Sequence, residues 1–342
     1  MESSGIGEEE RQEKPLRYHN ESVKSQEKIR VALIGVGSFG HNHLRVVQQL
    51  PQAVLTAVVD SNRQTAQAVA AETACRAAED ISSLQGVVDA AIIATPTTTH
   101  ADIGCELMAA GIDVLIEKPI AATIADAHRL TEAAATHRRI LQVGHLERFN
   151  PAVEVLESAI THPLFFEIHR LSVFTPRSLD VDVVLDLMIH DLEIVLALTK
   201  SMPEEIRAAG IQILSGRVDI ANVRLLFPGG CVANLTASRA STERVRKLRV
   251  FQPHEYLSLD YSRQEVFRVQ VSPEKQISFQ PVAVGKDEPL KREVASFLEC
   301  VTTRAKPRVS GTEAAQALEV ALAILDKIEE HAQVVTRGLA RR

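Results

Sequence analysis

Two hydrophobic patterns follow one another along the chain. Between about residues 28 and 143, short runs of apolar and β-branched residues alternate with stretches in which apolar residues recur every three or four positions. The runs are typical of strands buried on both faces, and the stretches are typical of amphipathic helices. Their alternation predicts a doubly wound sheet of parallel strands. The expected strands cover 28–34, 54–60, 87–96, 113–116 and 139–143, and the expected helices cover about 38–50, 61–72, 100–110 and 123–136.

The pattern changes after about residue 149. Short strand-like runs now follow one another directly, separated by turn residues such as Pro228-Gly229-Gly230. Consecutive strands joined by tight turns predict an antiparallel sheet that helices cover in part. The expected elements are helices at about 150–160, 290–303 and 312–330, one long helix from the loop 174–181 to about 198, and strands that include 164–171, 221–227 and 231–236.

The first expected strand ends in the glycine-rich turn Gly35-Val36-Gly37-Ser38-Phe39-Gly40. In a G-x-G-x-x-G turn, Gly35 permits the tight bend, Gly37 lets the backbone approach a pyrophosphate, and Gly40 lets the helix pack on the strand. The helix that starts there directs free N–H groups and its positive dipole end at the phosphates. The turn, with Ser38 and Phe39, therefore predicts a dinucleotide-binding site of the Rossmann type.

The second expected strand ends in Asp60, 20 residues beyond Gly40. A carboxylate at this place accepts hydrogen bonds from the adenosine ribose and would repel a 2′-phosphate, so the sequence favours NAD over NADP. Arg63 follows three residues later and could receive a phosphate, which leaves NADP as the alternative.

The predicted fold class is α/β, with a Rossmann doubly wound parallel sheet followed by an α+β domain that has a large, mostly antiparallel open sheet. We expect a disordered tail over 1–27, an NAD-binding domain over 28–148, and a substrate-binding and oligomerisation domain over 149–335. The strand-like region from about 204 to 271 has more strand than the expected helices can cover. An exposed sheet face of that size predicts a homodimer or homotetramer.

Composition narrows the functional class further. The net charge of −6 gives no basic footprint for nucleic acid, and no apolar run reaches the ~18 residues that a membrane span needs. The chain begins without the apolar core of a signal peptide. Its four cysteines are scattered without a C-x-x-C pair, so neither a disulfide framework nor a metal site is expected. These features are typical of a cytoplasmic protein that acts on small molecules.

Polar residues follow two of the expected parallel strands at the edge where such sheets hold ligands. Thr95-Pro96 ends one strand, and Glu117-Lys118-Pro119 follows another. A lysine at a strand's carboxyl end is positioned to meet a substrate that lies against a nicotinamide. The alternative is a lysine that merely contacts solvent at a strand end, and spacing alone does not separate the two.

The long helix of the second region carries Asp186 and His190 inside an apolar stretch. Residues four apart lie on one face of an α-helix, so these two are expected to lie together. Such a pair could relay protons, orient a substrate hydroxyl or ligate a metal, because an unpaired polar group in apolar surroundings is costly. The alternative is a buried pair that only fixes packing.

Taken in order, the glycine turn, Thr95-Pro96, Glu117-Lys118-Pro119 and Asp186-x-x-x-His190 resemble the Gfo/Idh/MocA oxidoreductases over about residues 28–335. The resemblance implies that Lys118, Asp186 and His190 face the nicotinamide across a cleft between two domains. Lys118 and His190 would handle the proton of a sugar hydroxyl while NAD takes the hydride. It also implies cofactor contacts from Thr95, Pro96, His100, Glu117 and Lys118.

The segment Gly144-His145-Leu146-Glu147-Arg148-Phe149-Asn150-Pro151 and the run Thr175-Pro176-Arg177-Ser178 look like the nucleotide-sugar branch of that family. The resemblance implies substrate contacts from Arg148, Asn150, Arg177 and His190. Guanidinium groups bind a diphosphate in a bidentate fork. The alternatives are an inositol or free-sugar dehydrogenase, whose substrate has no phosphate for these arginines, and a non-catalytic NAD-binding regulator of the same fold.

Overall fold

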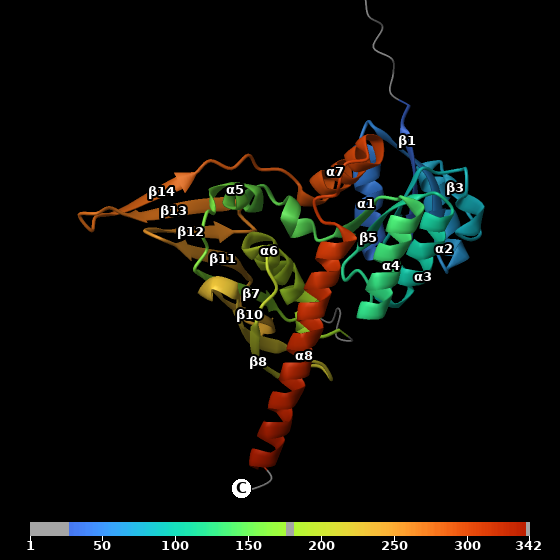
Figure 1. Ribbon diagram of the computed structural model, residues 1–342. Coiled ribbons are helices and arrows are strands. Elements are labelled where there is room, and N and C mark those ends of the chain that lie inside the picture. The colour runs from blue at the N-terminus through green and yellow to red at the C-terminus, as the bar shows by residue number, and fades with distance from the viewer. Residues whose placement is uncertain (1–26, 176–180, 340–342) are drawn as a thin grey trace, which may run out of the picture.

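The computed structural model describes residues 27–175 and 181–339 (Figure 1). The predictions for the tail at 1–27 and for Arg177 therefore lie outside the described residues, apart from residue 27. Within the described ranges, no helix combines the length and the apolar character needed to cross a membrane.

The first half of the chain forms the predicted Rossmann fold. Six parallel strands lie in the order β3-β2-β1-β4-β5-β6, with helices on both faces. The strands are β1 (Ile29–Ile34), β2 (Ala53–Val59), β3 (Arg76–Ala77), β4 (Ala90–Ile93), β5 (Asp113–Glu117) and β6 (Leu141–Gly144), and the helices are α1 (Ser38–Gln49), α2 (Arg63–Thr73), α3 (His100–Ala109) and α4 (Ile124–His137).

The second half forms the predicted large sheet, of eight strands in the order β14-β13-β12-β11-β7-β10-β9-β8. The β7–β10 pair is parallel and the other pairs are antiparallel, so the sheet is mostly antiparallel, as predicted. Its strands are β7 (Phe165–Val173), β8 (Glu205–Ile211), β9 (Ile220–Leu226), β10 (Val232–Ser241), β11 (Val245–Gln252), β12 (Glu255–Asp260), β13 (Glu265–Val271) and β14 (Ile277–Val282), and its helices are α5 (Pro151–Ala159), α6 (Ile189–Thr199), α7 (Pro289–Thr303) and α8 (Gly311–Leu339).

Local sequence signals set several helix ends. Thr123 caps α4, because its side chain accepts a hydrogen bond from the Asp126 N–H (3.1 Å) and donates one to the Asp126 carboxylate (2.8 Å). After α3, Gly111 adopts a positive φ of 85°, which turns the chain into β5. These contacts connect residues that are close in sequence, and this is why the pattern alone predicts them.

The two last helices connect the two halves of the molecule. Val294, Phe297 and Leu298 of α7 pack in the core between β1 and α1, which Figure 1 shows beside α7. Helix α8 contributes Leu318 to the core of the first sheet and Ile324 to the core of the second. The predicted boundary at 148/149 assigns all of α7 to the second domain, whereas its side chains complete the core of the first.

The expected single long helix before residue 198 is not uniform. Residues Val184–Met188 form a π-helical turn, which we call η4, and α6 continues from Ile189. A π-turn changes which residues share a face, and such turns occur frequently at functional sites. The face predicted from α-helical spacing for Asp186 and His190 therefore needs correction.

Candidate active site

The turn after β1 needs glycine at two positions, because a side chain at either one would collide with the neighbouring backbone. Gly35 adopts a positive φ of 87°, and a Cβ added there would lie 2.7 Å from the Ala94 carbonyl oxygen. A Cβ on Gly40 would lie 2.1 Å from the Gly35 carbonyl oxygen. Gly37 instead faces open space, with no described atom within 4 Å of an added Cβ. This space lies at the N-terminus of α1 and fits the pyrophosphate of NAD.

Asp60 follows β2 and stabilises this turn through hydrogen bonds. Its Oδ2 accepts a hydrogen bond from the Val36 N–H (2.9 Å), and its Oδ1 accepts one from the Asn62 N–H (2.9 Å). Each carboxylate oxygen has a second lone pair, so the side chain can hold the turn and still accept from a ribose. Ser38 and Phe39 open α1, and Arg63 opens α2 with an exposed side chain. The preference for NAD over NADP remains a prediction.

His100 holds two chain segments together at the next strand ends. Its Nδ1 lies 3.0 Å from the Pro119 carbonyl oxygen and its Nε2 lies 3.0 Å from the Thr95 carbonyl oxygen. Burial lowers the pKa of His100, so the neutral ring donates to one of these carbonyls. The residue is only 1% exposed and positions Thr95 and Pro119, and its contact with the cofactor stays a prediction.

A cavity of about 390 Å³ at the carboxyl ends of the parallel strands brings some of the predicted cofactor residues together with Lys118 and Asp186. Elements of the second half, including η4 and the loop between β8 and β9, line its other side. Of the predicted catalytic and substrate residues in the described ranges, Lys118 and Asp186 line it, and His190, Arg148 and Asn150 do not. Of the predicted cofactor residues, Phe39, Thr95, Glu117 and Lys118 line it. The lining includes Phe39, Thr95, Glu117, Lys118, Pro119, Leu185, Asp186 and Arg217.

Lys118 joins the two halves of the molecule across this cavity. Its Nζ donates to the Asp186 carbonyl oxygen at 2.7 Å and lies 3.4 Å from Asp186 Oδ1. The Lys118–Pro119 peptide bond is cis. The side chain of Lys118 is 12% exposed and that of Asp186 is 31% exposed, so both reach the cavity from partly buried positions. Asp186 is therefore the partner of Lys118 and not, as predicted, of His190.

His190 lies behind the cavity against a second buried histidine. Its ring is 6.0 Å from that of His145, edge to face, and Nδ1 of His190 has no hydrogen-bond partner among the described residues. Burial, and then the positive charge of Lys118, lower the pKa of His190 well below its usual range. The same two causes lower the pKa of His145 to about 3. Both rings are therefore neutral at pH 7.

A buried ion-pair network supports the helix that carries His190. Arg170 of β7 donates to both carboxylate oxygens of Asp191, at 2.7 and 2.9 Å, and to Glu147 at 3.0 Å. The negative charges of Asp191 and Glu147 outweigh burial and raise the pKa of Arg170 well above its usual range. No local pattern indicated that Arg170 would contact Asp191, because the two lie on separate elements.

Two residues predicted to bind the substrate form hydrogen bonds and ion pairs inside the protein. Arg148 contacts Glu193 (2.9 Å) and Glu157 (2.8 Å), so its guanidinium already has partners within the protein. The Asn150 side chain caps α5 by accepting from the Ala152 N–H (3.1 Å), and it donates to Glu147. Neither lines the cavity at Lys118, and their direct contact with the substrate stays a prediction. Arg177 lies outside the described residues.

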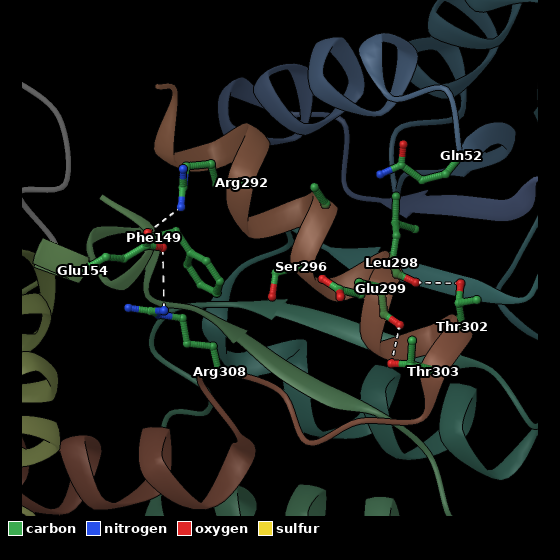
Figure 2. Close-up of a pocket in the computed structure, with 11 residues that line it drawn as sticks. Gln52, Phe149, Glu154, Arg292, Ser296, Leu298, Glu299, Thr302, Thr303 and Arg308 are labelled. Carbon is green, nitrogen blue, oxygen red and sulfur yellow. Dashed lines mark hydrogen bonds and ion pairs between the residues drawn. The ribbon is translucent and has the colours of Figure 1, made fainter. Parts of the chain in front are cut away.

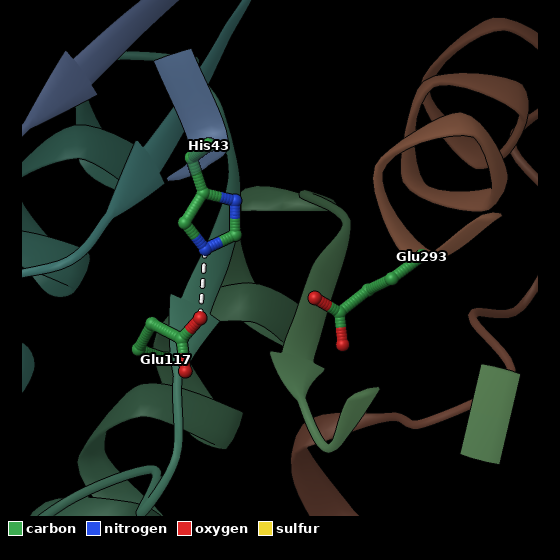
Figure 3. Close-up of side chains that lie close together, drawn as sticks. All are labelled: His43, Glu117 and Glu293. Atoms are coloured by element: carbon green, nitrogen blue, oxygen red, sulfur yellow. Dashed lines mark hydrogen bonds and ion pairs between the residues drawn. The ribbon is translucent and has the colours of Figure 1, made fainter. Parts of the chain in front are cut away.

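A cluster of buried titratable residues lies next to Lys118. Figure 3 shows His43 of α1 and Glu293 of α7 directed toward Glu117, and His43 Nε2 lies 2.7 Å from Glu117 Oε1. Burial and the charge of Glu117 raise the pKa of Glu293 well above its usual range, so that carboxyl is neutral. Ligand atoms within 4.8 Å of one another could hold a metal ion, but the His43–Glu117 hydrogen bond occupies two of them. We therefore interpret His43 and Glu117 as a hydrogen-bonded pair, and both carboxyl oxygens of Glu293 beside it have no hydrogen-bond partner among the described residues.

A second hollow, of about 640 Å³, lies beside α7 (Figure 2). Arg292 and Arg308 line it, and both contact Glu154 within the same hollow. The two arginines are thus paired within the hollow, and none of the predicted cofactor or catalytic residues lines it. The smaller cavity at Lys118 is the candidate active site.

Known proteins resemble the chain along most of its length. Residues 29–145 match the profile of the GFO_IDH_MocA oxidoreductase family with an NAD-binding Rossmann fold, and residues 153–253 match the GFO/IDH/MocA C-terminal domain. The chain is 34% identical over 311 residues to UDP-N-acetylglucosamine 3-dehydrogenase of Acidithiobacillus ferrooxidans, which covers 89% of this chain and 99% of that protein. A solved structure of that enzyme matches with a TM-score of 0.84 over 89% of this chain and 98% of that one.

Two other relatives match less completely. An inositol 2-dehydrogenase of Acidothermus cellulolyticus is 33% identical over 191 residues, 53% of this chain and 56% of that protein. A structure of an oxidoreductase from Agrobacterium radiobacter in complex with NAD⁺, L-tartaric acid and magnesium has a TM-score of 0.79 over 88% of this chain and 96% of that one. At 16% identity, the latter shows likeness of fold alone.

Proposed function

The chain belongs to the Gfo/Idh/MocA family of NAD-binding oxidoreductases, and from that premise we propose that it oxidises a secondary hydroxyl of a nucleotide sugar. The proposed reaction is that of a UDP-N-acetylglucosamine 3-dehydrogenase, which gives the 3-keto sugar. The observation that carries this proposal is the match to that enzyme over 99% of its length, whereas the inositol dehydrogenase match covers only 56%.

The residues that would hold NAD are those of the glycine turn and Asp60. NAD⁺, when bound, accepts the hydride that leaves the carbinol carbon. The hydroxyl proton must leave as well, and Lys118 is our candidate for the group that accepts it, because its amino group lines the cavity while His190 does not. Asp186 would orient that amino group through the contacts at 2.7 and 3.4 Å.

Neutral His190 has a different proposed role. With its pKa well below the usual range, it is not a proton donor at pH 7. Its ring does not line the cavity, and its contact with the substrate stays a prediction. We also propose that the enzyme works in the cytoplasm as a homo-oligomer. All four cysteines are free thiols, which fits a reducing compartment.

A substrate comparison tests the proposed function. Formation of NADH is followed at 340 nm with UDP-N-acetylglucosamine, its uronic acid, N-acetylglucosamine, myo-inositol and glucose. We expect the UDP sugars to give the highest kcat/KM, by at least about tenfold over the compounds without phosphate. Preference for myo-inositol would support the inositol dehydrogenase alternative, and no turnover of any compound while NAD still binds would support the regulator.

A further inference from the structure

We propose that Arg217 binds the diphosphate of an anionic substrate at the active-site cavity, an inference that rests on the proposed function. Arg217 lies in the loop between β8 and β9, and it lines the same cavity as Lys118 and Asp186. It would therefore hold the phosphates while the sugar ring lies against Lys118. The sequence pattern did not single it out, because nothing in its neighbourhood resembles a motif.

The Arg217 guanidinium is available for an external anion. No carboxylate of the described residues lies within ion-pair distance of it, and its side chain is exposed. Arg148, which the sequence suggested for this role, is buried between Glu157 and Glu193. A guanidinium without a protein partner can offer its planar fork of N–H donors to a diphosphate.

The loop that carries Arg217 is built around one buried carboxylate. Asp219 accepts backbone hydrogen bonds from Ile213 (2.7 Å), Leu214 (2.6 Å) and Ser215 (3.0 Å). The Ser215 hydroxyl donates to Asp219 at 2.7 Å and accepts from the Arg217 N–H at 3.1 Å. These contacts fix the backbone on which the guanidinium stands, so binding an anion costs less conformational entropy than on a loose loop.

The same loop is attached to the helix that carries Asp186. The Val218 N–H donates to the Asp182 carboxylate at 2.9 Å, and the Val183 N–H donates to the Val218 carbonyl oxygen at 2.9 Å. The Asp182 carbonyl oxygen accepts from the Asp186 N–H at 3.0 Å. The backbone of Arg217 is thus held at a fixed separation from the Lys118–Asp186 pair. A fixed separation would let the site select substrates by the distance between the reacting carbon and the phosphates.

The pyrophosphate of NAD is the other diphosphate that Arg217 could bind, because Phe39 of the glycine turn lines the same cavity. We assign Arg217 to the substrate because the glycine turn and the N-terminus of α1 already provide a phosphate site. Arg217 comes from the other half of the chain, from the loop between two strands of the second sheet.

The test compares Arg217→Ala and Arg217→Lys with wild type and with Arg263→Ala, an exposed arginine of the β12–β13 turn that does not line the cavity. We expect Arg217→Ala to raise KM for UDP-N-acetylglucosamine and the inhibition constant of UDP by roughly 10- to 100-fold, the loss typical of hydrogen bonds to a charged group. KM for NAD and kcat should stay within about threefold. Arg217→Lys should recover part of the loss, and Arg263→Ala should match wild type.

Binding of UDP, measured by calorimetry with NAD present, separates this inference from the proposed function. If wild type binds UDP through Arg217 but does not oxidise the UDP sugar, the proposed function fails and the inference stands. If UDP binds equally to wild type and Arg217→Ala, or does not bind wild type at all, the inference is overturned. A rise in KM for NAD alone would assign Arg217 to the cofactor and would also overturn it.

Discussion

At the residue scale, the surroundings of a side chain decide its role more than its type does. Lys118 and His190 both looked like candidate proton acceptors in the sequence. Lys118 lines the cavity and contacts Asp186, whereas His190 lies behind it, against His145, with a strongly lowered pKa. Arg148 and Arg217 differ in the same way, since only Arg148 has carboxylate partners in the described structure.

The buried histidines predict a pH dependence of stability. The pKa of His145 is about 3 in the folded chain and ordinarily about 6.5, so between these values only the unfolded chain binds the proton. Unfolding therefore becomes more favourable as the pH falls below 6.5, by about 1.4 kcal/mol per histidine between pH 7.5 and 5.5. When the pH falls from 7.5 to 5.5, we expect the free energy of unfolding of His145→Phe to decrease by about 1.4 kcal/mol less than that of wild type, as measured by urea unfolding.

An exposed histidine provides the control for this measurement. His128→Gln on α4 should lose as much stability as wild type between the two pH values. If His145→Phe and wild type lose equal amounts, His145 takes up a proton in the folded chain and its assignment as a neutral ring is wrong.

At the element scale, local patterns predicted the strands and helices, but contacts between distant elements were not predictable. The cap of α4 joins residues three apart, and the pattern indicated it correctly. The partner of Arg148, Glu193, is 45 residues away on another helix, so no local pattern reveals that the guanidinium is occupied. The π-turn at η4 also escaped prediction, because α-helical and π-helical spacing differ little over five residues.

From the packing of α7 we predict that the stability of the first half of the chain depends on a helix near the end of the sequence. Phe297 is fully buried in the core that β1 and α1 form. Phe297→Ala should lower the free energy of unfolding by about 3–5 kcal/mol, the usual cost of removing a buried phenyl ring. Glu299→Ala, on the exposed side of the same helix, should change it by less than about 0.5 kcal/mol. Similar values for the two variants in urea unfolding would contradict the packing of α7 on the first sheet.

At the scale of the whole molecule, the second sheet ends in a hairpin with an exposed apolar face. Val271 pairs with Ile277 across β13 and β14, and Phe267 pairs with Pro281. Phe279 is 70% exposed and Ile277 is 62% exposed on that same face. Single exposed apolar residues are ordinary, but a contiguous stripe on an edge hairpin is typical of a surface that another chain covers.

We predict that this hairpin contributes to a dimer or tetramer. Sedimentation at micromolar concentration should show an oligomer for wild type and a shift toward the 37.4 kDa monomer for Phe279→Asp. Gln280→Asp, on the opposite face of β14, should sediment like wild type. A wild type that sediments only as a monomer would contradict the prediction.

The most direct test of the proposed chemistry follows a labelled hydrogen. UDP-N-acetylglucosamine carrying deuterium at carbon 3 or, separately, at carbon 4 is incubated with the enzyme and NAD⁺, and the NADH formed is analysed by mass spectrometry. The account predicts deuterium in NADH from the carbon-3 label only, and a fall in the rate of at least about 100-fold in Lys118→Ala while NAD still binds. Transfer from carbon 4, or a normal rate of transfer in Lys118→Ala, would contradict it.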